Sequence, residues 1–139
     1  MTAPAPVRKY SLPEKTRLVL EVARTYRTAK GLMRSTDLPK TLETLRAGAK
    51  PTDTPTVSTA DAQRLGRVVI RTLAVLPADS RCLMRSLVLT GMLGRRGTAA
   101  NVVIGVRRGE AFGAHAWVEL DGRPLLPPGD GVFSRLTEL

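Results

Sequence analysis

The chain contains one cysteine and one histidine, and nucleophilic acyl transfer needs these two residue types. Cys82 lies in "DSRCLMRS", residues 79–86, and His115 lies in "AHAWVEL", residues 114–120. A thiolate can attack a carbonyl carbon while a neighbouring imidazole takes up and returns the proton, so a Cys–His pair can form and hydrolyse a thioester. This chemistry requires the fold to bring the two side chains together.

The sequence around Cys82 favours a reactive thiol. "ADSRCLMRSLVLTGMLGRRG", residues 78–97, predicts a helix with Cys82 in its first turn, where unpaired N–H groups and the helix dipole stabilise negative charge. The flanking Arg81 and Arg85 favour the thiolate in the same way. The alternative is that Cys82 is a small buried apolar residue, as most lone cysteines are.

His115 lies in the middle of an apolar segment, "AFGAHAWVEL", residues 111–120, which predicts a strand. The small neighbours Ala114 and Ala116 leave room around the imidazole. A core histidine with a hydrogen-bond partner is the alternative interpretation. A cysteine at a helix start and a histidine at a strand centre become neighbours if that helix packs on the sheet.

A third group is needed to orient the imidazole, and we consider the first three carboxylates that follow His115. At ~3.3 Å per strand residue, Glu119 is about 13 Å away and Asp121 roughly 20 Å away. A hairpin at the Asp-Gly turn brings residues 127–129 opposite His115, which makes Asp130 the candidate orienting acid. The alternative is that Asp130 is an ordinary turn residue in "PGDG".

Four helices are expected before these strands, because apolar residues recur at helical spacing between capping and breaking residues. Their predicted ranges are 12–33, 37–48, 62–76 and 78–97. The second ends at Gly48, and the third follows a capping box of Ser58 and Asp61. The fourth has Asp79 or Ser80 as its N-cap and ends at Gly94 or Gly97. The last helix is apolar in nearly all directions and should be buried on most sides.

After Gly97 the pattern changes to short β-branched segments. Strands are predicted over 100–108 and 111–120, and Asp121-Gly122 is a strong hairpin signal leading into "RPLL". The fold class is therefore α+β, with N-terminal helices packed on a small antiparallel sheet. We divide the chain into a helical N-terminal region with a Pro/Thr-rich linker, 1–57, and a catalytic core, 58–139.

The composition limits the classes of protein to which this chain can belong. The chain has 139 residues, a net charge of +10 and 42% hydrophobic residues, typical of one globular domain. No apolar stretch is long enough for a signal peptide or a membrane span, and a lone cysteine forms no intramolecular disulfide, so we expect a cytoplasmic protein. No metal or cofactor is expected. The positive charge lacks interleaved stacking aromatics, which argues for a solvated or partner-binding surface over nucleic-acid binding.

Three segments carry a family resemblance: "CLMRSLVLTGMLGRRG", "VVIGVRR" and "AHAWVELDGRPL". In order and spacing they resemble the lasso peptide biosynthesis B2 proteins, which are leader peptidases with a transglutaminase-like, papain-like cysteine-protease fold. The resemblance covers about residues 61–126 and implies Cys82 as nucleophile and His115 as general base and acid. The family acid often lies about twelve residues after the histidine, where this chain has Pro127. Either Asp130 replaces it or a Cys–His dyad suffices.

By this resemblance, the substrate is the leader peptide of a ribosomally made precursor (a RiPP), and a separate cyclase closes the macrolactam afterwards. The chain has no room for a fused recognition domain, so a separate small recognition protein of the B1 type is expected, with the basic helical N-terminal region as its docking surface. Two other functions stay open at this point: a non-enzymatic basic module that binds nucleic acid or an acidic protein, and a transglutaminase-like or acetyltransferase-like acyl transferase.

Overall fold

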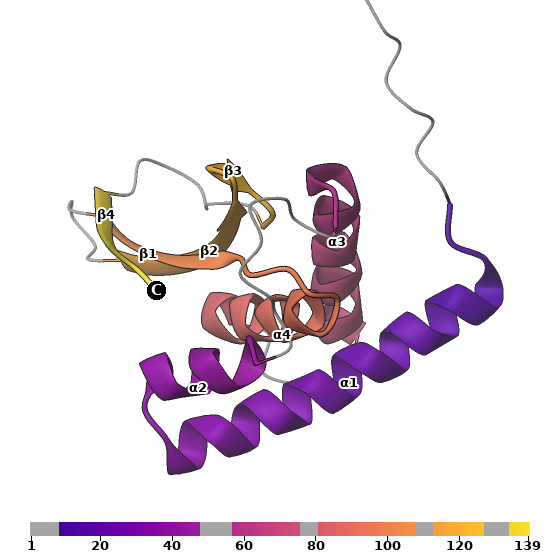
Figure 1. Ribbon diagram of the computed structural model, residues 1–139, viewed down its shortest axis with the longest axis horizontal. Coiled ribbons are helices and arrows are strands. Elements are labelled where there is room, and N and C mark those ends of the chain that lie inside the picture. Colours follow the sequence, from indigo (N-terminus) through magenta and orange to yellow (C-terminus); the bar gives the residue numbers. More distant parts are fainter. Residues whose placement is uncertain (1–8, 48–56, 76–80, 108–112, 127–133) are drawn as a thin grey trace, which may run out of the picture.

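The computed structural model describes residues 9–47, 57–75, 81–107, 113–126 and 134–139, which form four helices and one antiparallel sheet (Figure 1). The elements are α1 (Leu12–Ser35), α2 (Leu38–Leu45), α3 (Thr59–Val75), α4 (Cys82–Arg95), β1 (Asn101–Arg107), β2 (Gly113–Leu120), β3 (Arg123–Pro124) and β4 (Ser134–Glu138). The sheet order is β3-β2-β1-β4. The predicted α+β class is confirmed.

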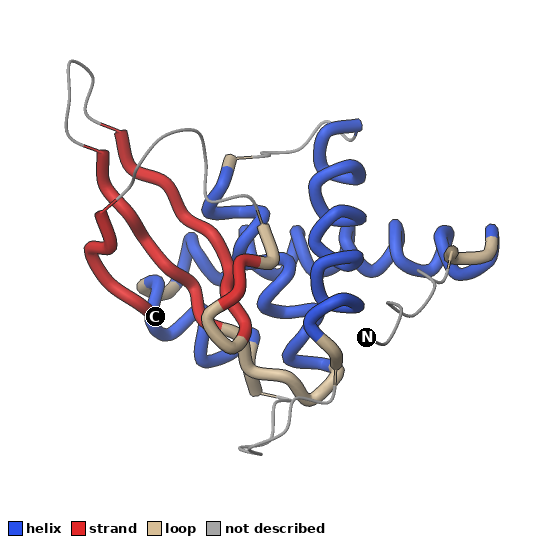
Figure 2. Tube along the Cα trace, turned by 90° about the horizontal axis from the view of Figure 1, so that it is seen from above, coloured by secondary structure: helices blue, strands red, loops and turns tan. Residues whose placement is uncertain are grey.

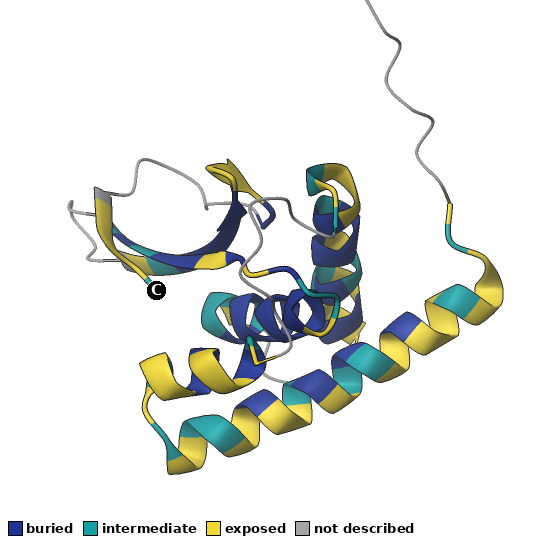
Figure 3. Cartoon of the chain, in the orientation of Figure 1, coloured by how far each residue is buried: buried dark blue, intermediate teal, exposed yellow. Residues whose placement is uncertain are grey.

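Helix α4 is the centre of the molecule. It packs against α1, α2, α3 and the sheet, and Figure 1 shows it lying between the sheet and α1. Its residues 86–94 are all buried, and most of its ribbon is dark blue in Figure 3. The apolar residues around its whole circumference explain this position, and the predicted burial on most sides is confirmed.

Helix α4 begins at Cys82, with Arg81 as N-cap and no side-chain capping bond. The prediction that Asp79 or Ser80 is the N-cap was therefore wrong; both residues lie outside the described ranges. Arg81 has the non-helical backbone of an N-cap, with φ −57° and ψ 152°. Its carbonyl accepts the Arg85 N–H at 3.1 Å, which is the first hydrogen bond of the helix. Packing of α4, rather than a side-chain cap, sets this start.

The other end of α4 agrees with the glycine signal. Gly97 has a φ of 79°, and the N–H of Thr98 donates to the carbonyl of Leu93 at 2.9 Å. The N–H of Gly97 donates to the carbonyl of Gly94 at 3.0 Å. This pair of bonds is a Schellman motif, which needs a residue that tolerates positive φ.

Two glycines inside α4 let neighbouring backbones approach closely. A Cβ at Gly94 would lie under 3 Å from the carbonyl oxygen of Leu45 at the end of α2. A Cβ at Gly91 would lie 2.8 Å from a methyl carbon of Thr25 in α1. Both α1 and α2 therefore pack on α4 at distances that only glycine permits there.

The remaining helix ends follow their local sequence in part. The hydroxyl of Ser58 accepts the N–H of Asp61 at 3.1 Å, as predicted for the start of α3. Helix α2 ends at Leu45, earlier than the predicted Gly48, which lies outside the described residues. The guanidinium of Arg46 donates to the carbonyls of Ala100 and Leu139, at 2.7 and 2.6 Å, and holds the chain where the helix stops.

The sheet contains the predicted hairpin and one strand that was not predicted. Asp121 and Gly122 have φ values of 52° and 76°, as the tight turn between β2 and β3 requires. Strand β4 pairs antiparallel with the other edge of β1, so β1, β2 and β4 run side by side in Figure 2. Its sequence was not recognised because four of its side chains, 135–138, are exposed and no apolar alternation marks it.

The buried apolar cluster includes residues of all four helices and of β1 and β2. Leu18, Val22 and Leu42 thus share one core with residues beyond the proposed boundary at 57/58. The division into two regions stays a prediction from the sequence. Among the described residues, no helix has the length and apolar character that crossing a membrane requires.

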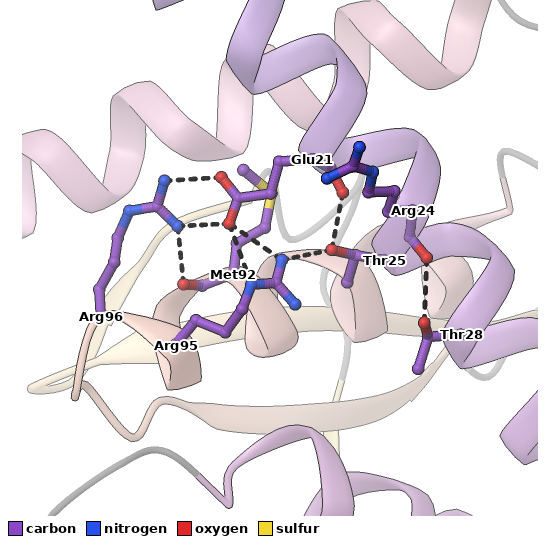
Figure 4. Close-up of polar contacts among 7 residues, drawn as sticks. All are labelled: Glu21, Arg24, Thr25, Thr28, Met92, Arg95 and Arg96. Atoms are coloured by element: carbon purple, nitrogen blue, oxygen red, sulfur yellow. Dashed lines mark hydrogen bonds and ion pairs between the residues drawn. The ribbon is translucent and has the colours of Figure 1, made fainter.

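An ion cluster ties α1 to the end of α4 (Figure 4). The Glu21 carboxylate accepts from Arg96 at 2.7 Å and from Arg95 at 2.9 Å, and Arg95 also donates to Thr25. The Glu21 side chain is 22% exposed. Burial alone raises the pKa of Glu21, but the hydrogen bonds and charges of Arg96 and Arg95 outweigh it, and its pKa is lowered.

Gly94→Ala should reduce the free energy of unfolding by about 1–3 kcal/mol, because the new methyl group must displace the backbone of Leu45. Gly31→Ala is the matched control in exposed helix, where a Cβ meets nothing within 4 Å. It should stabilise the protein by up to about 1 kcal/mol through helix propensity. Urea unfolding of both variants checks this; equal effects would contradict close packing at Gly94.

Glu21→Gln should destabilise the protein by roughly 1–2 kcal/mol at neutral pH, because the charge-assisted bonds to two arginines weaken. The pKa of Glu21 is lower in the folded than in the unfolded state, so its stabilisation is complete above the ordinary glutamate range and disappears as pH falls through the folded pKa. Unfolding curves of wild type and variant should converge in acid. The exposed Glu43→Gln is the control, with no such convergence expected.

Candidate active site

Cys82 is the first residue of α4 and is half-buried. The first N–H groups of a helix have no intrahelical partners, so the end of α4 that carries the Cys82 thiol has a partial positive charge. The hydroxyl of Ser86, which is fully buried, donates to the carbonyl of Cys82 at 2.8 Å. This bond adds to the helical ladder and fixes the first turn on which the sulfur is mounted.

The thiol of Cys82 lies against β2. The backbone N–H of Ala116 donates to Cys82 Sγ, with 3.4 Å between nitrogen and sulfur. Among the described residues, β3 pairs with β2 only at Glu119 and Leu120. At Ala116 the sulfur therefore accepts an N–H that a carbonyl of a neighbouring strand could otherwise accept. Ala116 directly follows His115. The structure therefore brings Cys82 to the strand position next to the histidine.

His115 is half-buried in the middle of β2. Its partner across the β1–β2 ladder is Gly105, which presents no side chain to the imidazole. The imidazole stacks on the indole of Trp117, with ring centroids 5.9 Å apart and an angle of 25° between the planes. The two rings are offset neighbours on one face of the strand, because they are two residues apart.

Glu119 continues this row, and a cation from another strand binds it. The indole Nε1–H of Trp117 donates to Glu119 Oε2 at 2.7 Å. Arg135 in β4 donates to both carboxylate oxygens of Glu119, at 2.8 and 2.7 Å, and also to Glu138. The hydrogen bonds to Glu119 raise the pKa of Arg135. His115, Trp117, Glu119 and Arg135 are called the β2 row below.

The carboxylates considered for the orienting acid have different positions. Glu119 binds Trp117 and Arg135. Asp121 occupies the hairpin turn with a positive φ. Asp130 lies outside the described residues. Its assignment as the third group therefore stays a prediction.

Sequence reasoning considered Glu119 only as a direct partner of His115 and missed its bonds to Trp117 and Arg135. Part of this could be seen in the sequence, because residues 115, 117 and 119 alternate along one predicted strand and share a face. The contribution of Arg135 had no such signal, because it comes from β4, a strand that was not predicted.

The arrangement suits nucleophilic chemistry. A thiol at a helix start, backed by unpaired N–H groups and next to an imidazole-bearing residue, fits the requirements of thioester formation. Within the described ranges, no three side chains of His, Cys, Asp or Glu gather as a metal site.

The comparisons with known proteins agree with this fold. The model of the transglutaminase-like superfamily matches residues 23–137, which include α2, α3, α4, β1, β2 and β3, the second half of α1 and all of β4 except Glu138. No curated protein and no solved structure matches the chain. Because the match covers most of the sequence, the chain belongs to the transglutaminase-like superfamily.

Proposed function

We propose that this protein is a cysteine endopeptidase that removes the leader peptide from a ribosomally synthesised lasso peptide precursor. One observation carries the proposal: Cys82 Sγ lies at the start of α4 and accepts the N–H of Ala116, the residue that follows His115. A buried apolar cysteine has no need of a helix start or of a strand N–H. The superfamily match is consistent with a cysteine-dependent enzyme.

In the proposed reaction, His115 takes the thiol proton and the Cys82 sulfur attacks the scissile carbonyl. The tetrahedral intermediate collapses when the imidazolium gives its proton to the departing amine, which breaks the peptide bond and leaves a thioester. Water then attacks the thioester, with His115 as base, and releases the leader acid and the thiol. The proton that His115 gives to the amine leaves with that product, and the proton that His115 then takes from water passes to the Cys82 sulfur, so the enzyme ends in its starting state.

Backbone N–H groups at the start of α4 and in β2 support the charges in this scheme. The Cys82 N–H has no intrahelical partner and is a candidate donor to the developing oxyanion. The N–H of Ala116 stabilises the thiolate and holds it in place against β2. Both donors belong to regular secondary structure, so little reorganisation is needed when charge develops.

The choice of substrate rests on the resemblance to the B2 leader peptidases. Its three segments form α4, β1 and the β2–β3 hairpin, and α4 and β2 meet at Cys82. The proposed partners are the precursor leader, a separate small recognition protein and the downstream macrolactam cyclase. The exposed cations of α1, such as Arg24 and Arg27, are a proposed docking surface for the recognition protein.

Cys82→Ala should abolish leader release, by at least roughly 10³-fold, because no other thiol is present to form the acyl-enzyme. The protein is incubated with precursor and recognition protein, and products are read by mass spectrometry. Hydrolysis adds one water across the cleaved bond, whereas acyl transfer joins the leader to a second amine. Full activity of a folded Cys82→Ala variant would rule out the proposed nucleophile, and a joined product would indicate a transferase.

Asp130 is the proposed orienting acid, and Asp130→Asn tests it. The variant should lower kcat by roughly 10²-fold or more, because a neutral amide does not stabilise the imidazolium. Asp121→Asn is the matched control, because asparagine tolerates the positive φ at this turn. Position 121 also lies beyond the end of β2, away from His115. Unchanged kcat in Asp130→Asn would indicate a Cys82–His115 dyad.

A further inference from the structure

We infer that Trp117 is a positioning residue for His115, and that Glu119 and Arg135 lock the indole in the orientation on which the imidazole stacks. This inference rests on the proposed role of His115. It goes further than that role, because it assigns a task in the same site to three residues of the β2 row that take no part in the bond-making steps.

The stacking contact is the first step of the argument. The imidazole lies 5.9 Å from the indole centroid at an interplanar angle of 25°. Trp117 is only 4% exposed, whereas His115 is half-buried. The more exposed ring therefore rests on the more buried one, and the indole face limits the rotation of the imidazole about its own side-chain bonds.

The indole is itself held at its polar end. Its Nε1–H donates to Glu119 at 2.7 Å in a buried environment, and a bond to a charged acceptor is roughly twice as strong as a neutral one. An indole that is packed at its face and bonded at its nitrogen has little freedom in either of its two side-chain torsions. Its plane, and with it the stacking surface under His115, is thereby set.

The buried carboxylate of Glu119 connects the indole of Trp117 to Arg135. Glu119 is 6% exposed, and a charge buried to this extent is costly unless it is paired. Arg135 pairs with both of its oxygens, although the Arg135 side chain is 49% exposed and comes from the edge strand β4. Simple filling of the core would use an apolar residue here. An ion pair ending on an indole N–H fits an orienting function better.

The experiment compares Glu119→Ala, Glu119→Gln and Trp117→Phe with wild type. Val118→Ala is the matched control, because Val118 is fully buried on the same strand but points to the opposite face. The first readout is the chemical shift of the imidazole ring protons, which is unambiguous because the chain has one histidine. The second is kcat against KM for leader release.

Glu119→Ala should move the imidazole resonances and lower kcat roughly tenfold with little change in KM, because orientation affects the proton-transfer steps and not leader binding. Glu119→Gln should restore most of both, since its amide oxygen still accepts the indole N–H. Trp117→Phe, which keeps a ring but lacks that N–H, should behave like Glu119→Ala. Val118→Ala should lower the unfolding temperature and leave the resonances and kcat as in wild type.

The inference is overturned if Glu119→Ala and Trp117→Phe lower stability as Val118→Ala does while kcat stays at the wild-type value. It is also overturned if Glu119→Gln is no better than Glu119→Ala. The resonance readout needs no substrate, so it tests the positioning of His115 even if Cys82→Ala shows that the peptidase proposal is wrong.

Discussion

The burial of α4 on every side over residues 86–94 is the constraint on which the rest of the structure depends. A helix that is apolar around its whole circumference must be covered on every side, and here α1, α2, α3 and the sheet provide the cover. Gly91 and Gly94 allow the two N-terminal helices to approach closely. With α4 fixed in this way, its first residue, Cys82, has one location, against β2.

Polar contacts secure α4 at both ends. At the C-terminal end, Arg95 and Arg96 hold Glu21 of α1. At the N-terminal end, the Cys82 thiol accepts the Ala116 N–H. The first contact is an ion cluster with strong bonds, whereas the second is a single weak bond to sulfur. The end of α4 that is far from the candidate site is thus held firmly, while the thiol at the other end remains available to react.

The β2 row shows how the sheet contributes to the same site. Successive residues of β2 serve opposite faces, so Ala116 contacts the sulfur with its backbone while His115, Trp117 and Glu119 share a face. Arg135 reaches this face from β4, two strands away in the sheet order. One strand therefore provides both a backbone donor to the nucleophile and the proposed base with its support.

The sequence by itself determined the helices, the β2–β3 hairpin, the α+β class and the two candidate catalytic residues, because these depend on local periodicity, turn chemistry and residue type. Only the tertiary structure decided where α4 begins, that β4 exists, and that Arg135 binds Glu119. Each of these depends on contacts between segments far apart in the chain, and no local pattern encodes them. The bond from Ala116 to Cys82 likewise forms only because α4 packs on β2, 34 residues further along the chain.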